Sequence, residues 1–260
     1  MSEYLAEIWR SRYFWLSLVR SDLRNRYRRS VLGIGWSMLH PLVMTGVLCT
    51  VFPLILHVDV HTYAPFLLAG LAFWNYLVSV TVSGCQSLFL AESYIRQQPK
   101  PLAIYSLRMA LGGTLHFFMT LIVVICLTWA VHGLPHPLAL ISLIPATILF
   151  FGLAWSTATI AGFANVFFGD TQHLVEDGFQ VMIFLTPVMY YPAILEKTRF
   201  AAVLGWNPLV FFLRLIREPL MQGHAASIAS FGACAAAVAI TATIAGLILR
   251  RQQDRLIFNL

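Results

Sequence analysis

Two long apolar runs, separated by a short polar break, dominate the middle of the chain. They read MALGGTLHFFMTLIVVICLTWAV (109–131) and LALISLIPATILFFGLAWSTATIAGFANVFF (138–168), and neither contains Asp, Glu, Lys or Arg. A helix of about 20 consecutive apolar residues is long enough to cross the hydrocarbon of a bilayer. These two runs therefore predict two membrane-spanning helices.

The composition of the whole chain extends this interpretation. Of its 260 residues 59% are apolar and 11% charged, and the mean hydropathy is +0.76. Soluble domains carry about 25% charged residues, so an ordinary soluble fold is excluded. The sequence predicts an all-α membrane protein with six transmembrane helices, over residues 33–56, 63–90, 109–131, 138–168, 178–194 and 225–249.

The distribution of basic residues orients these spans. Lys and Arg outnumber Asp and Glu 17 to 11 and gather beside the apolar runs. The connections 57–62 and 132–137 contain no Lys or Arg, whereas the N-terminal segment, the 92–108 connection and the C-terminal tail are basic. Cytoplasmic loops are enriched in Lys and Arg. Both termini are therefore expected in the cytoplasm.

The N-terminal segment has the pattern of a helix at the membrane surface. From Tyr4 to Arg28 apolar residues recur every three to four positions, and arginines occupy other positions. Such a helix is too polar to span and fits the head-group layer; an ordinary solvated helix is the alternative. We expect an amphipathic interface helix over 1–30, a transmembrane domain over 31–252 and a cytoplasmic tail over 253–260.

The segment from Thr186 to Gly223 does not fit simple counting of spans. It consists of two short apolar pieces, interrupted by prolines at 187, 192, 208 and 219. Pieces of about 10 to 14 apolar residues are more often re-entrant than spanning. The sequence predicts short re-entrant helices that enter from the outer face, between the fifth and sixth spans.

The common signatures of enzymes and of energy coupling are missing from the sequence. It contains no GxxxxGK[ST] phosphate-binding loop, no GxSxG and no HExxH, and the expected spans hold too few carboxylates for a proton relay. His57, Asp59 and His61 read as interface residues rather than metal ligands. We expect a transport subunit without catalytic residues, metal or cofactor of its own, with ATP and Mg bound to a partner ATPase.

A polar and aromatic group near the middle of the second span indicates a path for cargo. Trp74, Asn75 and Tyr76 lie about halfway along it. Aromatic faces cover the apolar faces of sugars, and amides and hydroxyls bind sugar hydroxyls, although plain helix packing explains the trio equally well. Arg217 either contacts acidic groups of the cargo or pairs with Glu218 or a helix end. The other candidate path residues are Trp36, His116, Tyr190 and Tyr191.

Several motifs, in order along the chain, resemble those of polysaccharide-exporting ABC-2 transporter permeases. Each is weak alone, but together they extend from Asp22 to Gly223. The matching residues are Asp22-Leu23-Arg24, Arg26 to Ser30, Leu32-Gly33, Trp36, Gly70, Trp74, Ile95 to Pro99, Ile104-Tyr105, Arg108, Thr186 to Tyr190, Asn207-Pro208, Arg217 to Leu220 and Gly223.

This resemblance implies a six-span permease of the bacterial inner membrane. It implies a homodimer that pairs with two ATPase subunits and exports a lipid-linked polysaccharide such as O-antigen, capsule, galactan or teichoic acid. The N-terminal helix and the 92–101 loop would face the ATPase, through Arg24, Glu92, Arg96, Pro99 and Lys100. Residues 190–208 would form outer gate helices, with Pro187, Pro192, Asn207 and Pro208 at the gate.

The sequence departs from the family pattern at Phe167-Phe168-Gly169-Asp170, where relatives often carry an Arg-rich stretch and this chain keeps the Asp alone. Two other functions remain open at this stage. One is an ABC-2 permease for a small lipid or drug. The other is a membrane enzyme acting on lipid-linked sugars, which would need convergent acidic or His residues that the sequence does not offer outside residues 170–177.

Overall fold

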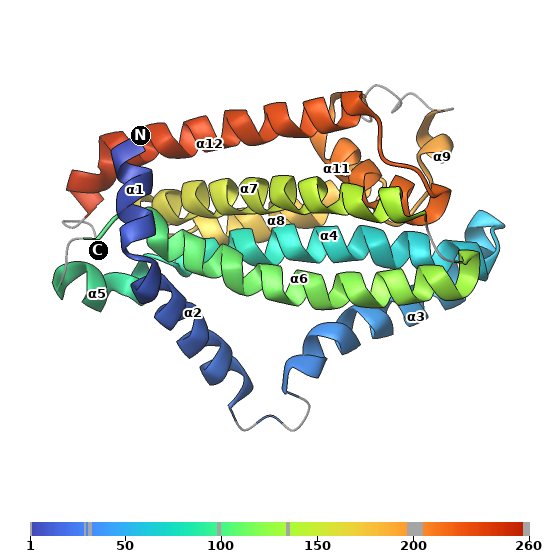
Figure 1. The fold of residues 1–260 in the computed structure, drawn as a ribbon, viewed down its shortest axis with the longest axis horizontal. Coiled ribbons are helices and arrows are strands. Elements are labelled where there is room, and N and C mark those ends of the chain that lie inside the picture. The colour runs from blue at the N-terminus through green and yellow to red at the C-terminus, as the bar shows by residue number, and fades with distance from the viewer. Residues whose placement is uncertain are drawn as a thin grey trace.

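The computed structural model describes residues 2–28, 30, 33–97, 100–133, 136–196 and 205–256. Within these residues the chain is helical, as expected, and the long helices lie alongside one another in a bundle (Figure 1). The elements are α1 (Ser2–Arg10), α2 (Arg12–Tyr27), η1 (Gly33–Gly35), α3 (Trp36–Leu56), α4 (Val60–Gln86), η2 (Phe89–Ala91), α5 (Glu92–Gln97), α6 (Ala103–His132), α7 (Pro137–Phe167), α8 (Thr171–Leu185), α9 (Pro192–Glu196), α11 (Pro208–Arg217), a π-helical turn η3 (Glu218–Gln222) and α12 (Ile228–Leu256).

Five of the described helices are long and apolar enough to cross a membrane: α3, α4, α6, α7 and α12. This finding identifies a multi-pass membrane protein and matches five of the six expected spans. The fifth expected span, 178–194, differs from the structure. Helix α8 begins earlier, at Thr171, and its 15 residues extend about 22 Å, less than the roughly 30 Å of bilayer hydrocarbon.

Helix α4 forms the centre of the bundle. In its apolar stretch 72% of the residues are buried, against 11% for α12, and its neighbours include α3, α6, α7, α8 and α11. Small residues allow the closest of these approaches. A Cβ at Gly84 would lie 2.6 Å from Ala158 of α7, and one at Gly162 would lie 2.7 Å from the Gly84 carbonyl. Small residues at such contacts are typical of membrane helices.

Different helices and connections lie at the two ends of the bundle. In Figure 1, α1, α5 and the C-terminal end of α12 lie at one end, and α9, α11 and the α3–α4 and α6–α7 connections lie at the other. The expected single N-terminal helix is two helices, because the chain bends at Ser11. Helix α1 lies across the end of the bundle, whereas α2 diverges from it and α3 returns, like the arms of a V (Figure 1).

Candidate functional site

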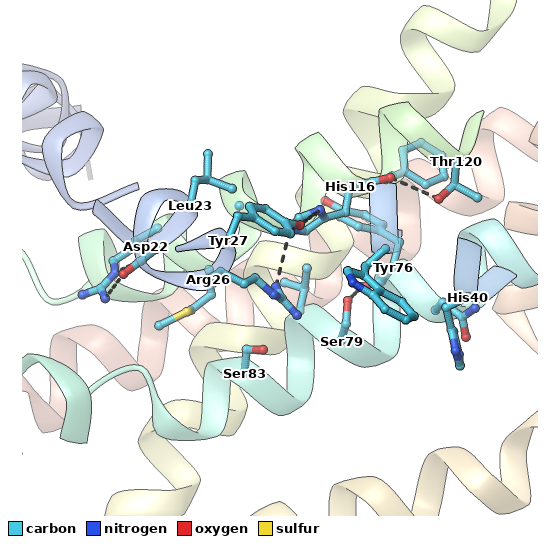
Figure 2. A pocket seen from close by; sticks show the side chains of 18 of the residues that line it. Asp22, Leu23, Arg26, Tyr27, His40, Tyr76, Ser79, Ser83, His116 and Thr120 are labelled. Atoms are coloured by element: carbon cyan, nitrogen blue, oxygen red, sulfur yellow. Dashed lines mark hydrogen bonds and ion pairs between the residues drawn. The ribbon is translucent and has the colours of Figure 1, made fainter. Parts of the chain in front are cut away.

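Helices α2, α3, α4 and α6 line an open cavity of about 490 Å³ (Figure 2). Each long helix contributes residues at the three-to-four spacing of one face. From α4 these are Ala72, Asn75, Tyr76, Ser79, Val80 and Ser83, and from α6 they are Met109, Gly112, Gly113, His116, Phe117 and Thr120. We call this space the V cavity, after the divergence of α2 and α3.

Two adjacent glycines of α6 shape the V cavity differently. A Cβ at Gly113 would lie 2.3 Å from Cγ2 of Val80, so the absence of a side chain there lets α4 and α6 approach closely. A Cβ at Gly112 would meet nothing within 4 Å. Gly112 therefore leaves open volume in the V cavity rather than a close helix contact.

Helix α2 supplies a polar wall directed at His116 of α6 (Figure 2). The Tyr27 hydroxyl lies 3.0 Å from Nδ1 of His116, and a guanidinium nitrogen of Arg26 lies 3.4 Å from its Nε2. The Tyr27 and His116 rings also meet edge to face, with centroids 5.8 Å apart. These contacts connect residues from opposite sides of the V cavity.

A salt bridge fixes the same two helices nearer the end of the bundle that carries α1. The guanidinium of Arg108, on α6, donates two hydrogen bonds to the carboxylate of Asp22, on α2. The Arg108 side chain retains 12% of its exposure and that of Asp22 retains 36%. Helix α2, which contacts α6 more than any other long helix, is thus held there by an ion pair as well as by packing.

Breaking this ion pair is expected to loosen α2. Asp22→Asn and Arg108→Gln should each lower the melting temperature, and the exchange Asp22→Arg with Arg108→Asp should recover part of the loss. For a partly buried pair we expect a coupling free energy of about 1 kcal/mol. A thermal double-mutant cycle on the purified protein, with Asp22→Asn, Arg108→Gln and the variant that carries both changes, measures this coupling. Additive effects of the two single changes would contradict the role of the pair.

The structure brings together four of the predicted path residues: Trp36, Asn75, Tyr76 and His116 all line the V cavity. Tyr76 also bonds to Thr114 at 2.9 Å. Trp74 does not line the V cavity. It lies in the core, where its side chain is 4% exposed, and it meets the Phe179 ring of α8 edge to face, with ring centroids 5.7 Å apart. The polar cavity residues that the predicted cargo path did not include are Asp22, Arg26, Tyr27, His40, Ser79, Ser83, Arg108 and Thr120.

The other predicted path residues lie at the opposite end of the bundle. Arg217 of α11 is buried, and its guanidinium donates to the carbonyls of Phe66, Pro187 and Val188 at 3.3, 2.6 and 2.7 Å. It also lies 3.6 Å from the Phe66 ring centroid. A Cβ at Gly70 would lie 2.3 Å from this guanidinium, so Gly70 makes room for it. Among the described residues Arg217 forms no salt bridge with Glu218 or another carboxylate.

The predicted gate residues surround this arginine or connect the helices beside it. Asn207 accepts a hydrogen bond from the Leu209 amide at the start of α11 and donates to the Thr186 hydroxyl at 2.8 Å, after the end of α8. Pro187, Tyr191 and Pro192 line a cavity of about 370 Å³ with Arg217. The Tyr190 hydroxyl donates to the Phe184 carbonyl. These residues form one packed unit between α8 and α11.

The residues predicted to contact an ATPase lie at the end of the bundle that carries α1. Glu92 and Arg96 form an exposed salt bridge of 2.9 Å on α5, and Arg24 is exposed on α2. Phe14 of α2 contacts Tyr94 of α5, with ring centroids 6.0 Å apart. Lys100 is half-buried, and Pro99 lies outside the described residues. The N-terminal helices and α5 therefore form one continuous surface.

Among the described residues no group of three His, Cys, Asp or Glu side chains is close enough to hold a metal ion.

Known proteins similar to this chain are permeases. No family model matches it. A Klebsiella pneumoniae protein named O-antigen export system permease protein RfbA is 28% identical over 211 residues, 79% of each chain. A second protein of that name from the same species is 26% identical over the same shares, and one from Myxococcus xanthus is 25% identical over 81% of each chain. The chain is similar in sequence to O-antigen export permeases. This finding confirms the resemblance to polysaccharide-export permeases and favours a transport role over an enzymatic one.

Proposed function

We propose that the protein is the membrane permease subunit of an ATP-driven exporter that moves a lipid-linked polysaccharide, similar to O-antigen, out of the cytoplasm. The observation that carries this proposal is the similarity to O-antigen export permeases over 79% of the chain, in a protein with five helices able to cross a membrane. A small lipid or drug as cargo is not favoured by the names of these relatives.

The proposal includes six crossings of the bacterial inner membrane. Helix α8 would make the fifth crossing together with the segment that follows it, since it contacts α4 and α7 and lies between two ends of the bundle (Figure 1). The basic end with α1 and α5 would face the cytoplasm. Arg217 and the residues packed around it, Pro187, Tyr191 and Pro192, would form the gate at the outer mouth together with α9 and α11.

Cysteine labelling tests this orientation. In intact cells a membrane-impermeant maleimide should label His61→Cys and leave Arg96→Cys unlabelled, because His61 lies in the first turn of α4 and Arg96 on α5, at opposite ends of the bundle. Permeabilised cells provide the control, in which both positions should react. Labelling of Arg96→Cys in intact cells would contradict the topology.

Energy would come from a separate ATPase. The chain has no phosphate-binding loop, and transport of a polymer across about 30 Å of hydrocarbon needs a coupled source of free energy. Two ATPase subunits, holding ATP and Mg, would bind two copies of this chain. The apolar faces of α3 and α12, largely unburied within one protomer, leave room for the second copy.

The exposed pair on α5 is expected to transmit this energy. Arg96→Glu should reduce export about tenfold or more, because it places like charges beside each other at Glu92 and alters the surface that the ATPase would contact. ATP hydrolysis by the purified complex and surface polymer should both be measured. Arg251→Glu, exposed near the end of α12 and outside both α5 and the N-terminal helices, is the matched control; equal loss in both variants would contradict the assignment.

Deletion of the gene in its native host tests the proposed function. Cells without it should lose surface polysaccharide and accumulate lipid-linked polymer inside, and the intact gene should restore export. Cells that lack the partner ATPase should show the same defect. Normal surface polymer in the deletion strain would overturn the proposal, and unchanged polymer with altered drug resistance would favour the small-cargo alternative.

A further inference from the structure

We propose that Tyr63 of α4 and Arg217 of α11 are positioning residues of the outer gate. Together they hold the segment from Thr186 to Tyr191, which connects α8 to α9, against α4, the central helix of the bundle. The part that this segment plays in a gate rests on the proposed function. The attachment itself rests on hydrogen bonds, ring contacts and burial, and it does not depend on what the protein transports.

The segment needs side-chain partners because it is not helical. Its first residues are buried, and a membrane-embedded carbonyl outside a helix must find its donor elsewhere in the protein. Three consecutive carbonyls receive one side-chain donor each. The Arg217 guanidinium donates to the carbonyls of Pro187 and Val188 at 2.6 and 2.7 Å. The Tyr63 hydroxyl donates to the Met189 carbonyl at 2.6 Å. Side chains of two different helices therefore replace the hydrogen bonds that a helix would supply.

Helix α4 is held at the same place, because Arg217 binds it as well. The guanidinium donates to the Phe66 carbonyl at 3.3 Å, and its central carbon lies 3.6 Å from the centroid of the Phe66 ring. That ring also meets the Tyr191 ring, with centroids 4.3 Å apart. Gly70 leaves space for the guanidinium, since a Cβ there would lie 2.3 Å from Nη2 of Arg217 and 2.8 Å from the Val188 carbonyl oxygen. The non-helical segment therefore contacts α4 through its backbone and through a side chain.

Breaking this attachment would be costly. Tyr63 is fully buried and Arg217 is 7% exposed. Within the part of the chain that the structure describes, Arg217 lies within salt-bridge distance of no carboxylate, so carbonyl oxygens and the Phe66 ring compensate its charge. Separation would leave a buried cation and buried carbonyls without partners. The segment is therefore expected to follow α4 when α4 moves.

Helix α4 also leads to the surface that the partner ATPase is proposed to bind. Its 27 residues extend about 40 Å, and the chain continues from its C-terminal end through η2 into α5, which carries Glu92 and Arg96. Its N-terminal half carries Tyr63, Phe66 and Gly70. Figure 1 shows α4 running between the end of the bundle with α5 and the end with α9 and α11. A displacement of α5 would therefore reach the outer gate through one continuous helix and the two positioning residues.

Hydrogen exchange of the purified full-length protein tests the attachment. Tyr63→Phe removes the hydroxyl that binds Met189 and keeps the ring. It should speed exchange of the amides of residues 188–191 about tenfold, because one buried hydrogen bond is worth up to about a factor of ten. Tyr105→Phe is the matched control, since Tyr105 is also fully buried but its hydroxyl has no hydrogen-bond partner among the described residues. It should leave exchange of these amides as in the wild type. Equal exchange in Tyr63→Phe and wild-type protein would overturn the proposal.

A second variant disturbs the attachment at Arg217 without removing a donor. Gly70→Ala places a Cβ against the guanidinium and the Val188 carbonyl oxygen, and it should speed exchange of residues 188–191 at least as much as Tyr63→Phe does. Gly178→Ala on α8 is the control, because a Cβ at Gly178 meets nothing within 4 Å, and it should leave this exchange unchanged. Wild-type exchange in the Gly70→Ala protein would overturn the role of Arg217 in the attachment.

The role in gating is measured as polymer exported per ATP hydrolysed, in vesicles that hold the complex with its ATPase and lipid-linked polysaccharide extracted from the native host. Tyr63→Phe should lower this ratio several-fold at an unchanged rate of ATP hydrolysis, whereas Tyr105→Phe should leave the ratio as in the wild type. A merely structural role would change the number of folded complexes but not the ratio, so an unchanged ratio would overturn the positioning role. Failure of the proposed function is a different result, in which the wild-type complex itself exports no polymer.

Discussion

Replacing Arg217 by methionine is expected to cause a large loss of stability. The guanidinium donates to three backbone carbonyls, of Phe66, Pro187 and Val188. A buried acceptor that loses its donor costs about 1–3 kcal/mol. The Phe66 carbonyl keeps its bond within α4, so the carbonyls of Pro187 and Val188, which lie outside helices, should together cost at least about 2 kcal/mol. The folded protein should no longer accumulate in the membrane, as fluorescence-detected size-exclusion chromatography would show.

Arg214 provides the matched control for this experiment. It lies on the same helix but is exposed, and its guanidinium carbon lies 5.4 Å from the centroid of the Phe211 ring. Arg214→Met should change the free energy of unfolding by less than about 0.5 kcal/mol. Arg217→Lys should lie between the two, since an ammonium lacks the fork that reaches several carbonyls. Equal stability of Arg217→Met and Arg214→Met would contradict the structural role.

The long spans could be predicted because they are uninterrupted apolar runs, and hydrophobic length is a sufficient signal for a membrane helix. The fifth expected span began at Gly178 because Glu176 and Asp177 interrupt the apolar pattern. In the structure α8 starts at Thr171 and its polar first turns have partners. Gln172 accepts a hydrogen bond from Gln86 of α4 at 2.5 Å and donates to Glu176 at 2.9 Å. Tertiary hydrogen bonds of this kind leave no periodic signal in the sequence.

The V cavity could be predicted in part for a related reason. The lining that α4 and α6 contribute includes polar and small residues at the three-to-four spacing of one helix face. This periodicity can be recognised in the sequence. The α2 wall of the V cavity depends on the pairing of Asp22 with Arg108, 86 positions away, and a single sequence does not reveal this pairing. The sequence therefore predicts Arg26 on a basic surface helix; in the structure it is exposed on α2 and also lines the V cavity.

Trp74 and Asn75 are expected to fail in different ways when each is replaced by alanine. The sequence placed them in one group because they are neighbours, but consecutive helix residues differ by about 100° in direction. Trp74 is directed at Phe179 of α8 in the core, and Asn75 lines the V cavity. Trp74→Ala should cost about 3–5 kcal/mol through the space that it leaves, whereas Asn75→Ala should change stability by less than about 0.5 kcal/mol.

The readouts for this pair are the amount of folded protein in the membrane and the surface polymer per folded molecule. Trp74→Ala should lower the first and leave the second near the wild-type value, because packing affects how many molecules fold. Asn75→Ala should leave the first unchanged and lower the second several-fold, since the amide would contact the lipid-linked cargo in the V cavity. Trp74→Phe, which keeps an aromatic ring against Phe179, should recover much of the lost protein. Normal accumulation of Trp74→Ala with reduced export would instead return Trp74 to the cargo path, where its position beside Asn75 and Tyr76 in the sequence first placed it.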